Sequence, residues 1–453
     1  MEYKSTRGKV KGGSFKDVVL MGLADDGGLI VPEEVFQPDF SQLKNLNYKD
    51  LALEIFKLFI SDIPEKDLKE LVEKSYKNFD KEEVVNLKKI KEDFYVLELF
   101  YGPTLSFKDI ALQFLGNLFE YILKEENKKM NVLGATSGDT GSAAIWALKD
   151  KENIKVFILY PYQRVSRLQE LQMTATESDN IYPVAIKGTF DDCQQIVKEL
   201  FSDLEFKADY NLGAVNSINF ARILAQTIYY FYSFFKSGKE EVYFSVPTGN
   251  FGNIFAGYLV KRMGLPIKKL ILATNENDIL TRFINSGDYS VRKVIKTISP
   301  AMDIQIASNF ERYLYYFYDE NPEIVKKKME EFKEKKALKF SELEVKKAQE
   351  DFISFSISQE QALEIIKEIY EKYNYLICPH TACGVKALLK VEDEIPKISL
   401  ATAHPAKFPQ VYEKIGIKNP LSEKIEILKK REKKFYILEA DTQKVKEFII
   451  SKN

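Results

Sequence analysis

The spacing of apolar positions changes near residue 93. In residues 50–60 and 65–79 apolar side chains recur every three or four positions, which predicts amphipathic helices. Beyond residue 93, short apolar runs such as 94–100 and 130–135 alternate with helical stretches. Repeated strand–helix units of this kind predict parallel sheets covered by helices. The fold class we predict is therefore α/β, preceded by a mostly helical N-terminal extension.

The length of 453 residues suits two lobes better than one simple core. Residues 322–352 are a charged helical insertion, which we interpret as a solvated face or a mobile cover. The boundaries that we predict are an N-terminal region at 1–92, a large α/β domain at 93–135 and 215–420, a smaller α/β domain at 136–214 and a C-terminal tail at 421–453.

Composition narrows the classes of function. A net charge of −1 gives no electrostatic basis for binding nucleic acid or an anionic membrane. The three cysteines, Cys193, Cys378 and Cys383, are too few and too scattered for a disulfide framework or a zinc site. With only His380 and His404 as histidines, we expect no metal centre and no Ser-His-Asp triad. The chain shows no apolar leader and no run of about 18 apolar residues, so we expect a cytoplasmic protein.

Lys108 stands in an unusual setting for a lysine. It follows the predicted strand at 94–100 and a turn, and it begins a helical stretch. The helix dipole opposes a cation at a helix N-terminus, and burial beside Phe107 adds to this, so we expect a lowered pKa. A neutral lysine amine is a nucleophile that forms Schiff bases. The alternative is a lysine that extends into solvent or pairs with Asp109.

Residues 246–257 predict a cradle for a phosphate. A strand ends there, Gly249 and Gly252 enclose a turn, and a helix follows. Glycines let the backbone approach an anion, and a helix N-terminus directs N–H groups at it. Asn250 and Asn253 offer further donors. The alternative is a plain tight turn with a helix cap.

Residues 134–148 repeat this strand–turn–helix design. Ser137, Thr140 and the backbone amides could hold a carboxylate. Asp139 is unexpected in an anion site, and the alternative is that it only caps the following helix.

One unusual lysine and two anion cradles, with hardly any histidine, together indicate pyridoxal 5′-phosphate. This cofactor needs an amine for its aldehyde and a cradle for its phosphate. A second cradle would hold the carboxylate of an amino-acid substrate.

Six segments carry a specific resemblance to the threonine synthase family, of the longer type with an extended N-terminal region. The resemblance runs nearly end to end, apart from the charged insertion and the last 30 or so residues. It implies the two-lobed fold of type II pyridoxal-phosphate enzymes, the tryptophan synthase β group. The segments are "YGPTLSFKDIALQ", "GATSGDTGSAA", "AVNSINFARILAQ", "SVPTGNFGNIFAG", "TNENDIL" and "LATAHPAKF".

The resemblance also implies site residues. Lys108 matches the lysine that forms the Schiff base with the cofactor, and Thr402 matches the residue whose hydroxyl faces the pyridine nitrogen. The loop with Ser137, Asp139 and Thr140 matches the one that receives the substrate carboxylate. The loop that holds the cofactor phosphate is matched by Gly249, Asn250, Phe251, Gly252 and Asn253.

The reaction that the resemblance implies is conversion of O-phospho-L-homoserine and water to L-threonine and phosphate, the last step of threonine biosynthesis. Lys108 is the natural base and acid for its proton transfers. The substrate phosphate needs further cations or donors, although each candidate also has a plain surface interpretation. The candidates are Arg164, Ser166, Arg222 and Lys407.

Two alternatives stay open at this point. Another fold-type II lyase or β-replacement enzyme, such as an amino-acid dehydratase, would share the lysine and the cradles. A non-catalytic relative or a dinucleotide binder is the other, against which Lys108, Thr402 and the complete 249–253 loop argue. We expect a small-molecule substrate, a monomer or homodimer, and no nucleic acid or membrane partner. We interpret His404 as structural.

Overall fold

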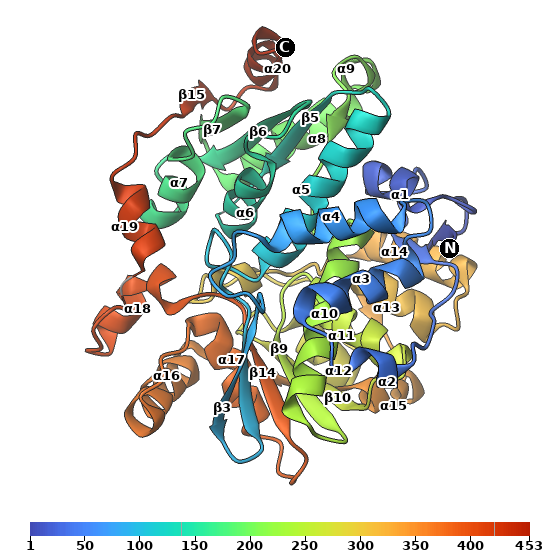
Figure 1. The fold of residues 1–453 in the computed structure, drawn as a ribbon, viewed down its shortest axis with the longest axis vertical. Coiled ribbons are helices and arrows are strands. Elements are labelled where there is room, and N and C mark those ends of the chain that lie inside the picture. Colours follow the sequence, from blue (N-terminus) through green and yellow to red (C-terminus); the bar gives the residue numbers. More distant parts are fainter. Residues whose placement is uncertain (137, 421) are drawn as a thin grey trace.

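The computed structural model describes residues 1–136, 138–420 and 422–453. Within them, the larger sheet has six strands in the order β13, β10, β9, β14, β4 and β3, and it occupies the lower half of Figure 1. All neighbouring strands are parallel except β3 and β4. The strands are β3 (Asn86–Lys91), β4 (Phe94–Glu98), β9 (Val242–Pro247), β10 (Ile267–Thr274), β13 (Phe352–Ser356) and β14 (Lys397–Ala401).

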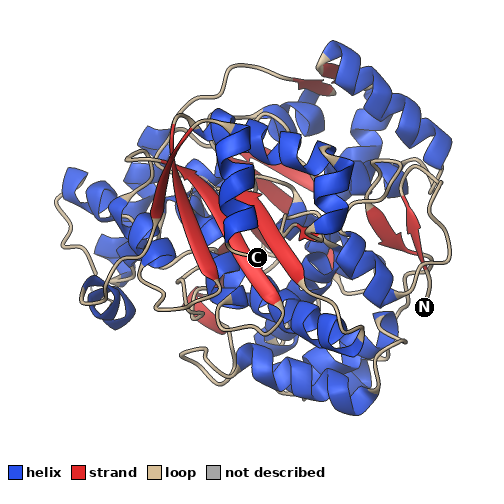
Figure 2. Cartoon of the chain, turned by 90° about the horizontal axis from the view of Figure 1, so that it is seen from above, coloured by secondary structure: helices blue, strands red, loops and turns tan. Residues whose placement is uncertain are grey.

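The smaller sheet lies in the upper half of Figure 1 and is parallel throughout. Its order is β15, β7, β6, β5 and β8, and helices cover it as Figure 2 shows. The parallel α/β class predicted from the alternation of strands and helices is therefore confirmed. The strands are β5 (Met130–Ala135), β6 (Ile154–Pro161), β7 (Ile181–Lys187), β8 (Leu212–Gly213) and β15 (Tyr436–Glu439).

The N-terminal region packs its predicted helices against the main core. Helices α3 (Tyr48–Phe59) and α4 (Glu65–Tyr76) confirm the spacing argument for this region. Their apolar faces meet α5 (Lys108–Glu125) and α10 (Phe220–Ser237), and the ring of Phe56 stacks on that of Phe114 with centroids 4.3 Å apart. This packing holds α5, and with it Lys108, in a fixed position.

The charged insertion folds as two helices and a short strand. Its strand β12 (Ala337–Lys339) pairs with β11 (Asp288–Ser290), between α14 (Pro322–Lys335) and α15 (Glu342–Asp351). Few side chains of the insertion are buried; one is Phe332, whose ring lies 5.2 Å from that of Tyr289. Most of its charges face solvent, as the mixed charge pattern predicts.

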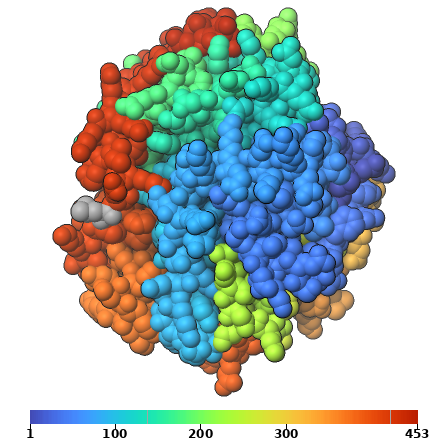
Figure 3. Space-filling view, in the orientation of Figure 1, coloured from blue at the N-terminus to red at the C-terminus, as the bar shows by residue number. Residues whose placement is uncertain are grey.

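The C-terminal residues leave the large domain and join the small one. The red segment in Figures 1 and 3 passes along one edge of the molecule, where β15 adds to the edge strand β7. Helix α20 (Thr442–Ser451) then packs on α8 (Phe190–Ser202), burying Val445 and Ile449. No helix in the described residues is long and apolar enough to cross a membrane.

Candidate active site

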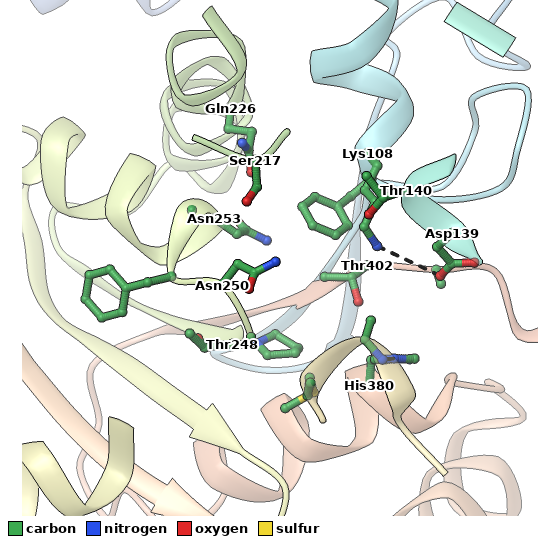
Figure 4. A pocket seen from close by; sticks show the side chains of 18 of the residues that line it. Lys108, Asp139, Thr140, Ser217, Gln226, Thr248, Asn250, Asn253, His380 and Thr402 are labelled. Carbon is green, nitrogen blue, oxygen red and sulfur yellow. Dashed lines mark hydrogen bonds and ion pairs between the residues drawn. The ribbon is translucent and has the colours of Figure 1, made fainter. Parts of the chain in front are cut away.

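A cavity of about 740 Å³, including its open mouth, lies among the loops that follow several strands of the two sheets. Its walls come from the starts of α5, α6 (Asp139–Leu148) and α11 (Gly252–Arg262), and from α10, α17 (Pro379–Leu388) and the residues after β14. Figure 4 shows Lys108 and Thr402 on one side of the cavity and Asn250 and Asn253 on the other, with the amine of Lys108 directed at Asp139. Helices begin at Lys108, Asp139 and Gly252, as the sequence pattern predicted.

Lys108 extends into the cavity rather than into solvent. Its side chain is 12% exposed, and its Nζ lies 3.9 Å from Oδ2 of Asp139. The alternative pairing with Asp109 is wrong, because Asp109 instead accepts hydrogen bonds from the N–H and the hydroxyl of Thr104, at 2.8 and 2.7 Å. Burial lowers the pKa of Lys108, as expected; Asp139 opposes the shift, and Lys407 and Arg222 add to it.

Asp139 accepts from Lys407 rather than capping its helix. The Nζ of Lys407 donates to Oδ1 at 2.8 Å, and the amide of Gln169 donates to the same oxygen at 3.0 Å. The N-cap of α6 is Gly138, without a side-chain cap, so the capping interpretation is wrong. Burial alone would raise the pKa of the Asp139 carboxyl, but Lys407 and Lys108 hold it well below its usual range. Asp139 is therefore a fixed anion.

The turn before α11 brings its backbone unusually close to the opposite loop. A Cβ on Gly249 would lie 2.6 Å from the carbonyl oxygen of Ala301, so only glycine fits there. Phe251 has a φ of +64°, in the left-handed region that residues other than glycine rarely adopt. Its ring is anchored among Phe310 and Phe352, with centroids 5.7 and 5.9 Å away. Such strain is characteristic of ligand-binding turns.

Asn253 presents an amide donor without a partner among the described residues. Its Oδ1 accepts from the hydroxyls of Tyr229 and Tyr230, at 2.5 and 3.0 Å. This fixes the amide orientation and leaves the buried Nδ2 free. An unpaired buried donor costs about 1–3 kcal/mol, so a ligand acceptor is expected at this wall of the cavity.

Arg222 and His380 add two further buried donors that lack a described partner, Nε of Arg222 and Nδ1 of His380. Burial lowers the pKa of Arg222 to about 10, which leaves the guanidinium charged at neutral pH. Burial also lowers the pKa of His380 to about 3. Because Nε2 of His380 accepts from the N–H of Ala301 at 3.2 Å, the ring proton resides on Nδ1. A cation and two neutral donors suit an anionic, phosphate-bearing cofactor and substrate.

The structure brings most of the predicted residues together, but not all of them. Arg164 and Ser166 are exposed and lie outside the cavity lining, where Ser166 caps α7 (Arg167–Thr174). Lys407 lies beneath Asp139, with its side chain 1% exposed. Ser137 lies outside the described residues. The predicted residues that line the cavity are Lys108, Asp139, Thr140, Arg222, Gly249, Asn250, Phe251, Gly252, Asn253 and Thr402.

Sequence reasoning missed Ser217, Gln226 and His380 as lining residues. Gln226 follows Arg222 by four positions on α10, so helical spacing was an available signal. His380 is the second residue of α17, after Pro379, and no pattern distinguished it from a structural histidine. His404 is structural as predicted, since its Nδ1 accepts from the N–H of Ala406 at 3.1 Å.

Comparison with known proteins accounts for this arrangement. Three family models match the chain: "Threonine synthase N terminus" at residues 2–76, "Pyridoxal-phosphate dependent enzyme" at 82–338, and "Threonine synthase, C-terminal" at 381–449. The threonine synthase of Saccharomyces cerevisiae is 48% identical over 90% of this chain and 87% of its own length. The chain belongs to the threonine synthase family. The threonine synthase of Pseudomonas aeruginosa is 42% identical over 99% of this chain and 98% of its own length.

Solved structures of the threonine synthase family share the whole fold. A PLP-bound threonine synthase from Brucella melitensis superposes with a TM-score of 0.97, at 41% identity over 100% of this chain and 99% of its own. The structure of threonine synthase from yeast superposes with a TM-score of 0.95, at 45% identity over 100% of this chain and 98% of its own. The chain is therefore a fold-type II pyridoxal-phosphate-dependent lyase with threonine synthase activity. The family, fold, cofactor and activity predicted from the sequence are confirmed.

Proposed function

We propose that the reaction runs in the cavity around Lys108, where O-phospho-L-homoserine and water become L-threonine and phosphate. The observation that carries this proposal is that one cavity is lined both by Lys108, whose side chain is mostly buried, and by the residues from Gly249 to Asn253, where the amide of Asn253 is free. An amine and a phosphate-binding turn on opposite walls are what pyridoxal phosphate requires. The helix starts supported by the core keep the two walls in place.

Four features of the cavity would hold the cofactor. Lys108 would bind its aldehyde carbon, and the turn from Gly249 to Asn253 its phosphate, with N–H groups at the start of α11 and the amide of Asn253 as donors. Thr402, 6% exposed, would offer its hydroxyl to the ring nitrogen. When bound, the cofactor withdraws electrons from the substrate and acidifies its Cα–H.

Lys108 then carries the protons. Its amine would take protons from Cα and Cβ of the substrate, which lets the Cγ–O bond to phosphate break, and would return protons to Cγ and to Cα. Water supplies the hydroxyl that adds at Cβ, and its remaining proton leaves with the phosphate. A lowered pKa favours this role, because a neutral amine is the competent base. His380, which also lines the cavity, is unsuited to the role of base. Its ring stays neutral because burial lowers its pKa, and the lone pair on its Nε2 already accepts a hydrogen bond from the N–H of Ala301.

We assign the two anionic ends of the substrate to different walls. The hydroxyl of Thr140 and the N-terminus of α6 suit the carboxylate. Arg222 suits the phosphate, because it is a buried cation for which the described residues provide no acidic partner. Arg164 stays a second candidate, since it follows β6 at the same edge of the small sheet as the start of α6.

The deciding experiment incubates the holoenzyme with O-phospho-L-homoserine and assays phosphate and threonine together. Equal amounts of both are expected. Release of phosphate with a 2-oxo acid instead of threonine would favour a dehydratase-like lyase. Absence of both products from a holoenzyme with full cofactor content would refute the proposed substrate.

We further propose a cytoplasmic enzyme, monomeric or homodimeric, that works without nucleic acid. The three cysteines are free and buried, which suits a reducing compartment. The near-zero net charge offers no general attraction to polyanions. Cell fractionation tests the location, sedimentation of the purified enzyme tests the oligomeric state, and its ratio of absorbance at 260 and 280 nm tests for bound nucleic acid.

A further inference from the structure

Asp139 stands between two lysines at the edge of the active-site cavity. Its Oδ1 is 2.8 Å from Nζ of Lys407, and its Oδ2 is 3.9 Å from Nζ of Lys108, the contact drawn in Figure 4. Its side chain is only 9% exposed. A carboxylate so enclosed, with a different cation at each oxygen, cannot rotate without breaking one of the contacts.

Lys407 is fully committed to this arrangement. Besides Asp139, it donates to the carbonyl oxygen of Thr104 at 3.0 Å, and its side chain is 1% exposed. Gln169 completes the support by donating to Oδ1 of Asp139. Lys407 is therefore poorly placed to bind a substrate phosphate.

The charge of Asp139 also limits what it can bind. An ionised carboxylate has no proton to donate, either to a substrate carboxylate or to an acceptor on the cofactor. Lys407 neutralises one of its oxygens, and among the described residues that line the cavity the amine of Lys108 is the cation paired with the other. The titratable or charged side chains that act on Lys108 and on its neighbour His380 are Asp109, Asp139, Arg222 and Lys407.

We propose that Asp139, locked in place by Lys407 and Gln169, is the positioning residue for Lys108. Its carboxylate orients the amine between proton transfers and keeps the Lys108 nitrogen protonated when that nitrogen is joined to the cofactor. Lys407 acts through Asp139, and it prevents this carboxylate from being an uncompensated buried charge. The inference rests on the proposed role of Lys108 and adds to it a means of holding the amine.

The test follows the visible absorbance of the holoenzyme as a function of pH, which reports the protonation of the nitrogen that joins Lys108 to the cofactor. Asp139→Asn keeps the shape and removes the charge, so this transition should move down by about one to three pH units. The kcat should fall about 10- to 100-fold, the scale of a misplaced catalytic group. The KM should change much less.

Lys407→Met tests the second part of the proposal through a double-mutant comparison. If Lys407 acts through Asp139, it should shift the transition in the wild-type background and much less in the Asp139→Asn background. Equal shifts in both backgrounds would show independent action and overturn this part. The matched control is Lys424→Met. Lys424 also pairs with an aspartate and donates to backbone carbonyls of the same turn, but its aspartate is Asp80 rather than Asp139.

A purely structural ion pair would lower thermal stability in Asp139→Asn without moving the absorbance transition, and that result would overturn the proposal. A second measurement needs no bound cofactor. Acylation of Lys108 in the cofactor-free protein, quantified by peptide mass at several pH values, should be faster at neutral pH in Asp139→Asn, because more of the amine is neutral. An unchanged rate would also overturn the proposal.

Failure of the proposed function would be distinguishable from failure of this inference. Borohydride reduction of the wild-type holoenzyme, followed by peptide mapping, shows whether Lys108 is the residue joined to the cofactor. The acylation comparison tests the contact between Asp139 and Lys108 whichever lysine the map identifies.

Discussion

The active site is recognisable at the level of single atoms by donors that the protein leaves unused. Asn253, Arg222 and His380 each bury a nitrogen for which the described residues offer no acceptor. Buried polar groups are nearly always paired, and these three nitrogens belong to residues that line one cavity, where a ligand can satisfy them. The Nδ2 of Asn253 is held outward by two tyrosine hydroxyls. These unpaired donors are therefore available to bind the anionic groups of the cofactor and the substrate.

Lys108→Ala should separate cofactor binding from proton transfer. The turn at Gly249 to Asn253 remains, so the variant should still bind pyridoxal phosphate, though less tightly. Borohydride should then fix no cofactor to the chain, and turnover should fall at least about 10²–10⁴-fold, because no amine takes the Cα proton. Near wild-type formation of threonine by this variant would contradict the central role given to Lys108.

Arg222→Gln should weaken substrate binding while leaving the cofactor in place. Loss of a charge-assisted contact of about 1.5–3 kcal/mol raises the KM for O-phospho-L-homoserine roughly 10- to 100-fold. Steady-state kinetics measure this, and the cofactor spectrum serves as the internal control. Arg164→Ala is the comparison variant, since Arg164 is exposed. A large rise in the KM of Arg164→Ala, together with a normal KM for Arg222→Gln, would show that Arg164 rather than Arg222 binds the substrate phosphate.

At the scale of elements, the site is built by three helix N-termini that meet at one cavity. Helices α5, α6 and α11 each follow a strand of one of the parallel sheets, at the carboxyl end where such sheets bind ligands. In the turn before α11 the close approach is to backbone, since a Cβ on Gly249 would meet the carbonyl oxygen of Ala301. Phe251 tolerates its left-handed φ because its ring is buried among other aromatic rings.

Gly249→Ala and Gly252→Ala form a matched pair that tests this turn. The new Cβ at position 249 would meet the Ala301 carbonyl at 2.6 Å, so backbone must move, at a cost of about 1–3 kcal/mol. At position 252 the nearest atoms would belong to side chains, Nδ2 of Asn309 at 3.2 Å and Cδ1 of Ile223 at 3.6 Å. Cofactor affinity and thermal stability, measured by dialysis and calorimetry, should fall clearly more for Gly249→Ala. Equal losses would show that closeness to Ala301 is unimportant.

The sequence predicted those features that depend on local pattern. Strand–turn–helix junctions at Lys108, Asp139 and Gly252 follow from glycines and apolar spacing, and the family resemblance supplied the cofactor. Pairing across distant segments was beyond local patterns. No residue near Asp139 in the sequence indicates that it pairs with Lys407, which lies 268 positions later (407 − 139). That pairing nevertheless helps to keep the Asp139 carboxyl ionised. The path of the C-terminal residues to β7 likewise depends on tertiary packing.

At the scale of the whole molecule, the chain crosses between the two sheets more than once. The small sheet takes β5 to β8 from the middle of the chain and β15 from its end, as Figure 1 shows. The cavity takes residues from both parts, Asp139 beside the small sheet and Thr402 after β14 of the large one. Folding of both parts and assembly of the site are therefore coupled, and burial of a site residue affects global stability.

His380 links the site to the stability of the entire fold through pH. Its pKa is lowered from 6.5 to about 3 by burial, so the native state keeps it neutral where the unfolded chain protonates it. The contribution to stability is thus complete above about pH 6.5 and is lost as the pH falls toward about 3. For this group alone, going from pH 7.5 to pH 5 should cost about 2 kcal/mol of the free energy of unfolding.

Urea unfolding of the cofactor-free protein at pH 7.5, 6 and 5 measures this effect against His380→Gln, in which the position cannot titrate. The wild type should lose about 2 kcal/mol more than the variant between pH 7.5 and 5. Carboxylates and His404 are common to both proteins, so their titration cancels in the difference. Parallel stability profiles would mean that His380 protonates in the native state near its ordinary pKa, and hence that the cavity wall admits water to it.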